Sequence, residues 1–491
     1  MTPDMNQSWY SRQGLALLTD FYELTMIAGY IKEGRADTRV CFEYFFRSLP
    51  PNAGFAVCAG LQPFLDYLSH LQFHEDDLAY LKSLKKFDDT TLEFLRAFRP
   101  TATVRAVPEG TLIFPHEPIV QIEGTIVEAQ LIETALLNFM NYETLIATKA
   151  ARICLAAQGE PVLEFGLRRA HGPDGGLSGS RAAYIGGCGS SSNVLAGKVY
   201  GVPVSGTHAH SWVMSFENEL DAFRAFTKLY PQNPILLVDT YDTIESGVPN
   251  AIQVFREMRE GGLQVRPAIR LDSGDLAKLS KLAHRKMAAA GFDDPLIVAS
   301  NDLEEDLIAD LKRQGAKINA WGVGTHLITS HDSPALNGVY KLVAIQSGGE
   351  WQPKIKISSN LAKATDPGRK SLVRYYNDRN EPIGDVLFDA NEKWPDSGVV
   401  PARQRGLPHL PTSLRSAVRG EQLLQTVFEN GRLTTLLPDI HTHRRRALDQ
   451  IGAIPDEYKR LRNPEIYSVL LSAQLGTTKA GLIQSLGVPG A

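Results

Sequence analysis

Two histidines lie two residues apart in the segment GTHAHSW (206–212), and they are the first candidates for chemistry. In a strand or just beyond one, residues two apart point to the same face, so the imidazoles of His208 and His210 are expected to share a face. Such a pair can bind a metal, as in hydrolytic barrels that begin with an HxH motif, or one histidine can act as a nucleophile or acid–base group. Both can also be structural, and the spacing alone leaves all three interpretations open.

Carboxylates recur downstream, in VDTYD (238–242), RLDSGDL (270–276) and SND (300–302). They supply Asp239, Asp272 and Asp302 without a matching set of histidine or lysine ligands, which counts against a metal held by the two histidines. Oxygen ligands suit magnesium, which usually reaches a protein through one or two carboxylates and the phosphates of a substrate. Asp272 and Asp239 could therefore hold ribose hydroxyls or magnesium, whereas Asp275 is expected to cap a helix.

Groups that bind anions accompany these carboxylates. In LEFGLRR (163–169), Arg168 follows Phe165 at a strand end; arginine matches carboxylate and pyrophosphate through forked hydrogen bonds, and an aromatic ring can stack on a planar ligand. In WGVGTHL (321–327), glycines stand where a strand meets a helix, so that backbone N–H groups could cradle a phosphate. A solvated arginine pair and a simple tight turn are the plainer interpretations of these two segments.

Strands must end beside these side chains to position them. From residue 161 onward, short apolar runs alternate with helical segments; the runs are PVLEFG (161), VPVSGT (202), ILLVDT (235), VRPAIRL (265), LIVASN (296), INAWGV (318) and VYKLVAI (339). About seven strands alternating with helices predict a parallel sheet, and a barrel suits that number. Sites in such barrels lie at the carboxyl ends of the strands, where the candidate residues stand.

The remaining segments predict the domain organisation. Residues 1–150 mix helical and strand-like runs and include a long helical stretch over 126–158, which indicates an α+β domain with a bridging helix. Residues 151–355 are expected to form the α/β barrel. Residues 356–491 are rich in basic residues and proline, predict a helix around 438–452, and are expected to pack back onto the N-terminal domain.

Composition and charge restrict the class of protein. A chain of 491 residues is too long for a single core, which stops growing near roughly 250 to 300 residues. A formal net charge of −4 provides no broad positive field for nucleic acid. The four cysteines form no CxxC pair, the N-terminus lacks a signal-peptide pattern, and no apolar run approaches the roughly 20 residues that span a bilayer. An enzyme of the reducing cytoplasm is therefore expected.

Taken together, the motifs resemble those of the nicotinate phosphoribosyltransferase family. The matching segments are LLTDFYELTM (17–26), EFGLRRAHGPDGG (164–176), GGCGSSSNVLAGKVYGVPVSGTHAHSW (186–212), RLDSGDL (270–276), WGVGT (321–325) and ATDPGRK (364–370). The resemblance implies an irregular α/β barrel of the type II phosphoribosyltransferases and an N-terminal α+β domain completed by C-terminal segments. It also implies that nicotinate and phosphoribosyl pyrophosphate react to nicotinate mononucleotide in NAD salvage, with magnesium as cofactor and ATP as co-substrate.

The resemblance implies roles for individual residues. His210 matches the histidine that ATP phosphorylates, and His208 occupies a variable position. The other matches are Arg168 and Arg270 near the base and pyrophosphate, Asp272 and Asp239 at the sugar and magnesium, and Gly322, Gly324 and Thr325 in the loop for the 5'-phosphate. In the implied homodimer, Tyr22 of one subunit would stack over a pyridine held against Phe165 of the other, and Arg47 and Arg369 would reach the phosphate from the adjacent subunit.

The choice of pyridine is expected to depend on the segment SSSNVLAG (190–197). The related nicotinamide enzyme has an aspartate on the helix that enters the base pocket, whereas Ser191, Ser192 and Asn193 are neutral. A carboxylate substrate would meet no charge repulsion there, so nicotinate is favoured. The alternatives are a phosphoribosyltransferase for nicotinamide or quinolinate, a metal-dependent barrel hydrolase that uses the HxH, and a non-catalytic ligand-binding protein.

Overall fold

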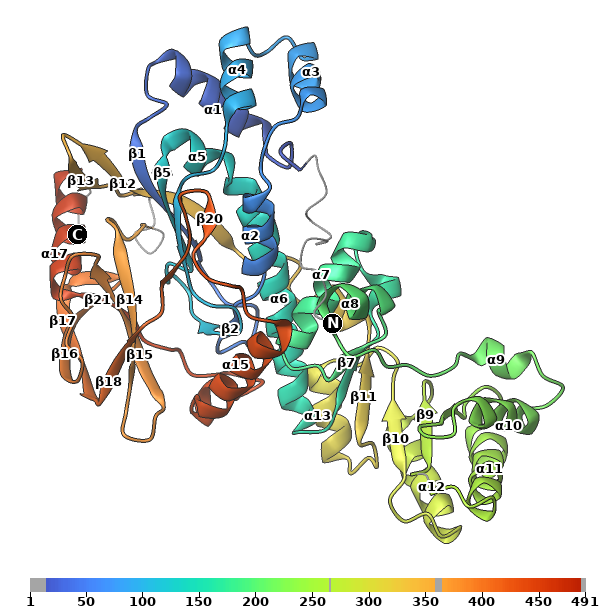
Figure 1. Ribbon diagram of the computed structural model, residues 1–491. Coiled ribbons are helices and arrows are strands. Elements are labelled where there is room, and N and C mark those ends of the chain that lie inside the picture. The colour runs from blue at the N-terminus through green and yellow to red at the C-terminus, as the bar shows by residue number, and fades with distance from the viewer. Residues whose placement is uncertain (1–14, 265, 358–363, 487–491) are drawn as a thin grey trace. The chain divides into compact units, whose positions relative to one another are not determined.

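The computed structural model describes residues 15–264, 266–357 and 364–486, and its chain divides into two compact units (Figure 1). Unit 1 comprises Met1–Leu145 and Ala335–Ala491, and unit 2 comprises Ile146–Pro334. The sequence predicted domain boundaries after residues 150 and 355. In the structure, the chain passes from one unit to the other after Leu145 and again after Pro334. Helix α6 (Glu133–Ala157) carries the chain from unit 1 into unit 2.

Unit 2 is built on a six-stranded parallel sheet. Its strand order is β7 (Ser190–Ser191), β6 (Val162–Glu164), β11 (Ala320–Val323), β10 (Leu296–Ala299), β9 (Ala268–Leu271) and β8 (Ile235–Leu237). The central strands β10 and β11 are short and almost entirely buried, because helices cover both faces of a parallel sheet. Residues that follow the strands therefore gather along one edge.

Helices and short helical turns connect these strands (Figure 1). In chain order they are η3 (Leu167–Arg169), α7 (Gly172–Ile185), α8 (Val194–Tyr200), α9 (His210–Met214), α10 (Glu219–Leu229), η4 (Thr243–Gly247), α11 (Val248–Glu260), α12 (Leu276–Ala289), α13 (Glu305–Arg313) and α14 (Thr325–Ile328). The carboxylate of Asp275 accepts the N–H of Lys278 at 2.9 Å, so the predicted N-cap of α12 is confirmed.

Two of the seven predicted barrel runs do not form strands of this sheet. The run at 202 contributes a single parallel bridge between Val204 and Ser191, because the chain soon turns into α9. The run at 339 is β12 (Gly338–Ser347), which pairs antiparallel with β1 (Arg39–Phe46) of unit 1. The α/β class and the parallel sheet are confirmed, but within the described residues no pairing between the edge strands β7 and β8 closes the barrel.

The described residues of unit 1 form two larger sheets, one small sheet and several helices. The first sheet has the order β13 (Glu350–Pro353), β12, β1, β5 (Val120–Thr125), β3 (Thr103–Ala106), β19 (Gln425–Glu429) and β20 (Arg432–Leu433). The second has the order β17 (Leu407–Ala417), β16 (Gly398–Gln404), β21 (Val469–Ser472), β15 (Pro382–Asp389), β14 (Lys370–Tyr376) and β18 (Arg419–Gln422). The small sheet pairs β2 (Ala56–Val57) with β4 (Leu112–Ile113).

The helices of unit 1 precede and follow these strands (Figure 1). They are α1 (Phe21–Lys32), α2 (Leu61–Ser69), α3 (Glu75–Ser83), α4 (Asp89–Ala97), α5 (Ile126–Leu131), α15 (Ile440–Ala453), α16 (Asp456–Lys459) and α17 (Ala473–Ser485). The long helical stretch predicted over 126–158 is confirmed as α5 and α6, which are separated at Ile132. No helix among the described residues is both long and apolar enough to cross a membrane.

C-terminal segments pack against N-terminal ones within unit 1. Strand β19 pairs with β3, and the side chain of Gln450 in α15 accepts the N–H of Leu112 at 2.8 Å. The rings of Phe114 and Tyr467 stack with their centroids 3.7 Å apart. The predicted helix around 438–452 is confirmed as α15, whereas the sheet formed by residues 370–472 was not predicted. Strand β14 is buried at every position, so it lacks the alternation that identifies a strand in a sequence.

Candidate active site

The candidate residues of unit 2 follow neighbouring strands of the parallel sheet. Phe165 comes directly after β6, Asp272 directly after β9 and Ser300 directly after β10, while Asp239 stands two residues beyond β8. Gly324 follows β11 and precedes α14. Since all these strands run in the same direction, the residues stand at the carboxyl edge where such sheets bind ligands.

The imidazole of His210 lies between two carboxylates and a hydroxyl. Its Nδ1 is 3.1 Å from Oγ1 of Thr240, and its Nε2 is 3.7 Å from Oδ2 of Asp272 and 4.0 Å from Oδ1 of Asp239. The side chain is 39% exposed, so a ligand can reach it. The hydroxyl of Thr240 can donate or accept, and either ring nitrogen can therefore carry the proton. The structure thus brings His210, Asp239 and Asp272 into one site.

Hydrogen bonds hold the two carboxylates, and each has an oxygen within 4.0 Å of Nε2 of the imidazole. Oδ2 of Asp239 accepts the N–H of Asp272 at 2.8 Å and the hydroxyl of Ser273 at 2.6 Å, while its Oδ1 is buried without a hydrogen-bond partner. Oδ1 of Asp272 accepts the hydroxyl of Ser300, which leaves Oδ2 near the imidazole. A buried carboxylate oxygen without a donor is costly, so Asp239 is poised for a cation or a hydroxyl.

His208 is directed away from this site. Its Nε2 accepts the N–H of Leu237 at 3.2 Å, and its ring packs edge-on against Phe226 with the centroids 4.6 Å apart. Burial lowers the pKa of His208 to about 4, so the ring is neutral at physiological pH. The expectation that both imidazoles share a face was wrong, because the chain is no longer extended where His210 begins α9. Within the described residues, no group of three or more histidine, cysteine or acidic side chains is arranged to hold a metal ion.

Two arginines create a positive region beside the carboxylates. Nη1 of Arg270, on β9, donates to the hydroxyl of Thr207, whereas its Nε is buried without a partner. Burial lowers the pKa of Arg270, and the charge of Arg168 adds to this effect, while Asp272 and Asp239 oppose it. Arg168 is exposed on η3. Because like charges repel, a bound anion would stabilise this pair.

The predicted phosphate loop divides into a packed and an accessible part. A Cβ added at Gly322 would lie 2.7 Å from two ring carbons of Phe165, so the glycine makes room for this ring. The N–H of Phe165 donates to the carbonyl of Val323 at 2.8 Å, which fixes the ring over β11. Gly322 is buried, whereas Gly324 and Thr325 are partly exposed. The accessible residues of this loop therefore lie in its second half.

The segment 190–193 is predicted to lie beside the base. Hydrogen bonds connect it to α7 and α8. Oδ1 of Asn193 caps α8 by accepting the N–H groups of Leu195 and Ala196, and Nδ2 donates to the carbonyl of Gly176 and the hydroxyl of Ser180, each at 3.2 Å. Asn193 is buried, so the structure gives its side chain a capping role. Ser192 is partly exposed and remains the more accessible of the two predicted contacts.

Three of the predicted site residues belong to unit 1. Tyr22 on α1 is 45% exposed; burial of its hydroxyl raises its pKa, and this hydroxyl donates a hydrogen bond to Glu133. Arg47 follows β1 and is partly exposed. The guanidinium of Arg369 donates from Nε to Glu123 at 3.0 Å and lies 4.8 Å from the ring centroid of Trp351.

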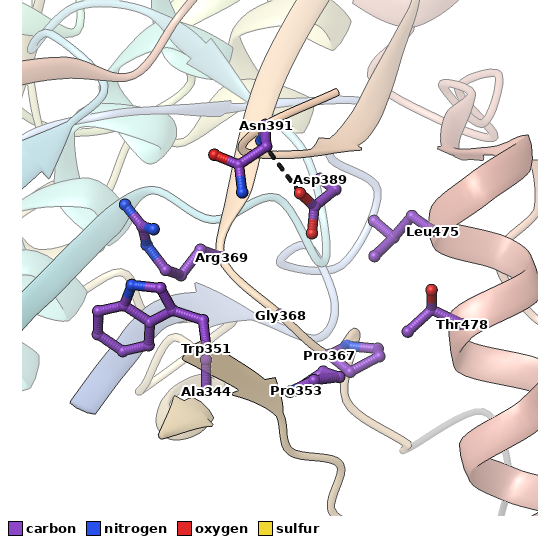
Figure 2. A pocket seen from close by; sticks show the side chains of 10 residues that line it. All are labelled: Ala344, Trp351, Pro353, Pro367, Gly368, Arg369, Asp389, Asn391, Leu475 and Thr478. Atoms are coloured by element: carbon purple, nitrogen blue, oxygen red, sulfur yellow. Dashed lines mark hydrogen bonds between the residues drawn. The ribbon is translucent and has the colours of Figure 1, made fainter. Parts of the chain in front are cut away.

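Arg369 also lines a pocket within unit 1 (Figure 2). Figure 2 shows its guanidinium above the ring of Trp351, with Asp389 and Asn391 across the pocket. The N–H of Asn391 donates to the carboxylate of Asp389 at 3.0 Å. Arg369 is thus already paired with an acidic and an aromatic side chain.

Several residues of the site were missed by sequence reasoning. Thr240, Ser273 and Ser300 supply the hydroxyl groups that orient His210, Asp239 and Asp272. Each lies in one of the three segments selected from the sequence for their aspartates, VDTYD, RLDSGDL and SND. A search for small hydroxyl residues next to those acids could have found them.

Known proteins match the chain along both units. Family models match at residues 17–141 (nicotinate phosphoribosyltransferase N-terminal domain), 162–381 (nicotinate phosphoribosyltransferase family) and 369–479 (nicotinate phosphoribosyltransferase C-terminal domain). A nicotinate phosphoribosyltransferase of Bacillus subtilis is 43% identical over 474 residues, which cover 96% of this chain and 95% of the relative.

Solved structures agree with these matches. The crystal structure of human nicotinic acid phosphoribosyltransferase has a TM-score of 0.82 at 35% identity, covering 96% of this chain and 100% of the other. The structure of nicotinate-nucleotide pyrophosphorylase from Pyrococcus furiosus has a TM-score of 0.68 at 25% identity, covering 89% and 95%. The predicted type II phosphoribosyltransferase fold is therefore confirmed, and the chain belongs to the nicotinate phosphoribosyltransferase family.

Proposed function

We propose that this enzyme joins nicotinate to the ribose 5-phosphate of phosphoribosyl pyrophosphate, forming nicotinate mononucleotide and pyrophosphate in NAD salvage, with ATP hydrolysis coupled through a phosphohistidine at His210. Family membership supports the transfer reaction. The observation that carries the proposal is the accessible imidazole of His210, within 4.0 Å of two carboxylates that themselves stand beside Arg270.

The transfer reaction requires alignment more than proton transfer. The pyridine nitrogen already has a lone pair, so it can displace pyrophosphate from the anomeric carbon of ribose without a strong base. The protein must align the ring, stabilise the departing pyrophosphate and exclude water, which is positioning combined with electrostatic preorganisation. In this proposal Arg168 and Arg270 bind the anionic groups, and Gly324 and Thr325 receive the 5'-phosphate.

Magnesium fits the acidic residues of the site. Oδ1 of Asp239 is buried without a donor, and Oδ2 of Asp272 lies on the same side of the imidazole. Two such oxygens, completed by phosphate oxygens and water, match the way in which proteins hold this ion. When bound, magnesium would neutralise part of the charge that develops on pyrophosphate. Asp239 and Asp272 would orient it while also holding ribose hydroxyls.

Phosphorylation of His210 would supply the coupling to ATP. A neutral imidazole nitrogen attacks the terminal phosphorus of ATP, the bond from this phosphorus to the bridging oxygen breaks, and ADP leaves with the bonding electrons. The positive charge that develops on the ring is stabilised by the adjacent carboxylates. The phosphohistidine would then alter the affinity for phosphoribosyl pyrophosphate and for the products, and its hydrolysis would reset the cycle. Such coupling acts only through different affinities of the two states.

The preference for nicotinate is supported by the charges beside the predicted base site. Glu164 is fully buried and bonded to serine hydroxyls, and Ser192 presents a neutral group. A carboxylate substrate would therefore meet Arg168 without facing an exposed acid from this segment.

The site would be completed by a second copy of the chain in a cytoplasmic homodimer. Tyr22 is 45% exposed on α1, which suits a ring that stacks on a ligand held by another subunit. In this proposal it would cover the pyridine that Phe165 of the other subunit supports, and Arg47 and Arg369 would approach the phosphate. Sedimentation velocity of the purified protein would determine the oligomeric state.

The decisive experiment compares three pyridines. The purified enzyme is incubated with phosphoribosyl pyrophosphate, magnesium and either nicotinate, nicotinamide or quinolinate, with and without ATP, while the mononucleotide and ADP are followed together. We expect nicotinate to react fastest and ADP formation to accompany it. Faster reaction of another pyridine, or mononucleotide formation that ATP does not influence, would contradict the proposal.

A further inference from the structure

A fully buried glutamate lies behind the predicted base site. The carboxylate of Glu164, the last residue of β6, is 0% exposed. Its Oε1 accepts the N–H of Gly166, and its Oε2 accepts the hydroxyls of Ser180, at 2.9 Å, and of Ser191. Among the described residues, no lysine, arginine or histidine forms an ion pair with it. Three hydrogen bonds alone compensate the buried carboxylate.

These three bonds join three separate segments. Gly166 directly precedes the turn η3, which carries Arg168, while Ser180 belongs to α7 and Ser191 belongs to β7. The hydroxyl of Ser191 accepts in turn the N–H of Asn193, which caps α8. The network therefore connects the turn with Arg168 to the segment that contains Ser192.

The carboxylate of Glu164 also constrains the position of Phe165. Phe165 stands between Glu164 and Gly166, and its ring packs on Gly322 of β11. A Cβ added at Gly166 would lie 2.9 Å from Oε1 of Glu164 and 2.5 Å from Cβ of Ile328, so the turn is packed tightly on this carboxylate. A shift of the glutamate would move Phe165 and Arg168 together.

Burying a carboxylate without a cation is expensive, and an apolar side chain could fill the same space at lower cost. A network in which every donor is used restricts the segments to one arrangement. From this geometry we infer that Glu164 is a positioning residue for nicotinate: it fixes the turn bearing Arg168 and the ring of Phe165 at the spacing that the pyridine carboxylate requires. The inference rests on the function proposed above.

The test replaces Glu164 by glutamine, which keeps the shape and can still accept the N–H of Gly166. The glutamine NH2 can donate to Ser180, whose hydroxyl has a second acceptor in the carbonyl of Gly176. The hydroxyl of Ser191 then loses its acceptor. We expect the KM for nicotinate to rise about tenfold, as the loss of one charge-assisted hydrogen bond implies. The KM for phosphoribosyl pyrophosphate is expected to rise less, by about threefold at most, because the turn bearing Arg168 supplies only part of the anion contacts and the others lie on other strands.

Glu305→Gln is the matched control. Glu305 is an equally buried carboxylate of unit 2, but it pairs with Lys149 at 2.8 Å and Arg152 at 2.9 Å. Its substitution should lower the melting temperature without raising the KM for nicotinate selectively. If Glu164→Gln also changes only the melting temperature, or raises both KM values equally, the positioning role is refuted.

A second variant covers the case in which Glu164→Gln fails to fold. Ser191→Ala removes one donor while it retains the carboxylate, and a selective rise of about threefold in the KM for nicotinate is expected. An unchanged KM for nicotinate in this variant would overturn the inference. The wild-type enzyme distinguishes failure of the positioning role from failure of the proposed function. If the wild-type enzyme does not convert nicotinate, the proposed function itself is contradicted.

Discussion

Replacing Asp239 by asparagine would remove one negative charge beside His210 while it keeps the size of the side chain. Oδ2 of Asp239 accepts the N–H of Asp272 and the hydroxyl of Ser273, and the amide oxygen of asparagine can accept both. The NH2 group would then occupy the position of Oδ1, 4.0 Å from Nε2 of His210. The substitution therefore tests the charge of the site and leaves its hydrogen-bonded frame in place.

The distance gives the expected magnitude. Two unit charges 4.0 Å apart interact by about 4 kcal/mol at an effective dielectric constant of about 20. Because the side chain of His210 is 39% exposed, screening by solvent reduces this to about 2 kcal/mol. The positive charge that develops on the imidazole during phosphorylation would lose this stabilisation, so the rate of ADP formation should fall about 30-fold.

The assay measures ADP and nicotinate mononucleotide together at saturating substrates, and the melting temperature of each variant. Asp242→Asn is the control, because Asp242 is exposed and caps η4 by accepting the N–H groups of Ile244 and Glu245, a role that asparagine fills equally well. Its rates should match those of the wild type. ADP formation by a folded Asp239→Asn variant within about threefold of the wild-type rate would refute the electrostatic reasoning.

Three further predictions concern the nucleophile, the ring over the pyridine and the pH dependence of stability. His210→Ala should abolish the stimulation by ATP and retain some ATP-independent synthesis, so a variant with normal coupling would exclude the phosphohistidine. Tyr22→Ala should raise the KM for nicotinate about tenfold while Tyr22→Phe, which keeps the ring, should not; equal values in both variants would contradict stacking. Burial raises the pKa of Glu23 from 4.5 to about 7, so the folded protein binds this proton more tightly, and stability should fall by about 3 kcal/mol as pH rises from about 4.5 to about 7. Urea midpoints at pH 5 and pH 8 would reveal this loss, which Glu23→Gln should abolish; the same loss in the variant would assign it to other groups.

The strands of unit 2 could be predicted from the sequence because each is a short aliphatic run followed by polar residues. Five of the seven predicted runs are strands of the parallel sheet, and Asp272 and Phe165 stand directly after theirs. The run at 339 was assigned to the wrong sheet, because local composition does not tell which strand will be its partner. Its pairing with β1 joins residues about 300 positions apart in the chain.

The orientation of individual side chains was harder to predict than their location. His208 and His210 have the spacing of a common face, yet one ring packs on Phe226 and the other faces Thr240. The expected common face depended on an extended backbone, which ends before α9 begins. Gly322 was interpreted as part of a phosphate loop, whereas its missing side chain makes room for the ring of Phe165.

By itself, the sequence determined the family, the parallel sheet and the residue types that stand at its strand ends, because these depend on local runs and on motifs of adjacent residues. The family motif had already indicated His210 rather than His208. Only the tertiary structure decided which hydroxyls orient the carboxylates beside it and why Glu164 can be buried without a cation. Each of these depends on donors and acceptors from different strands meeting within about 3 Å, a distance set by the packing of the whole unit.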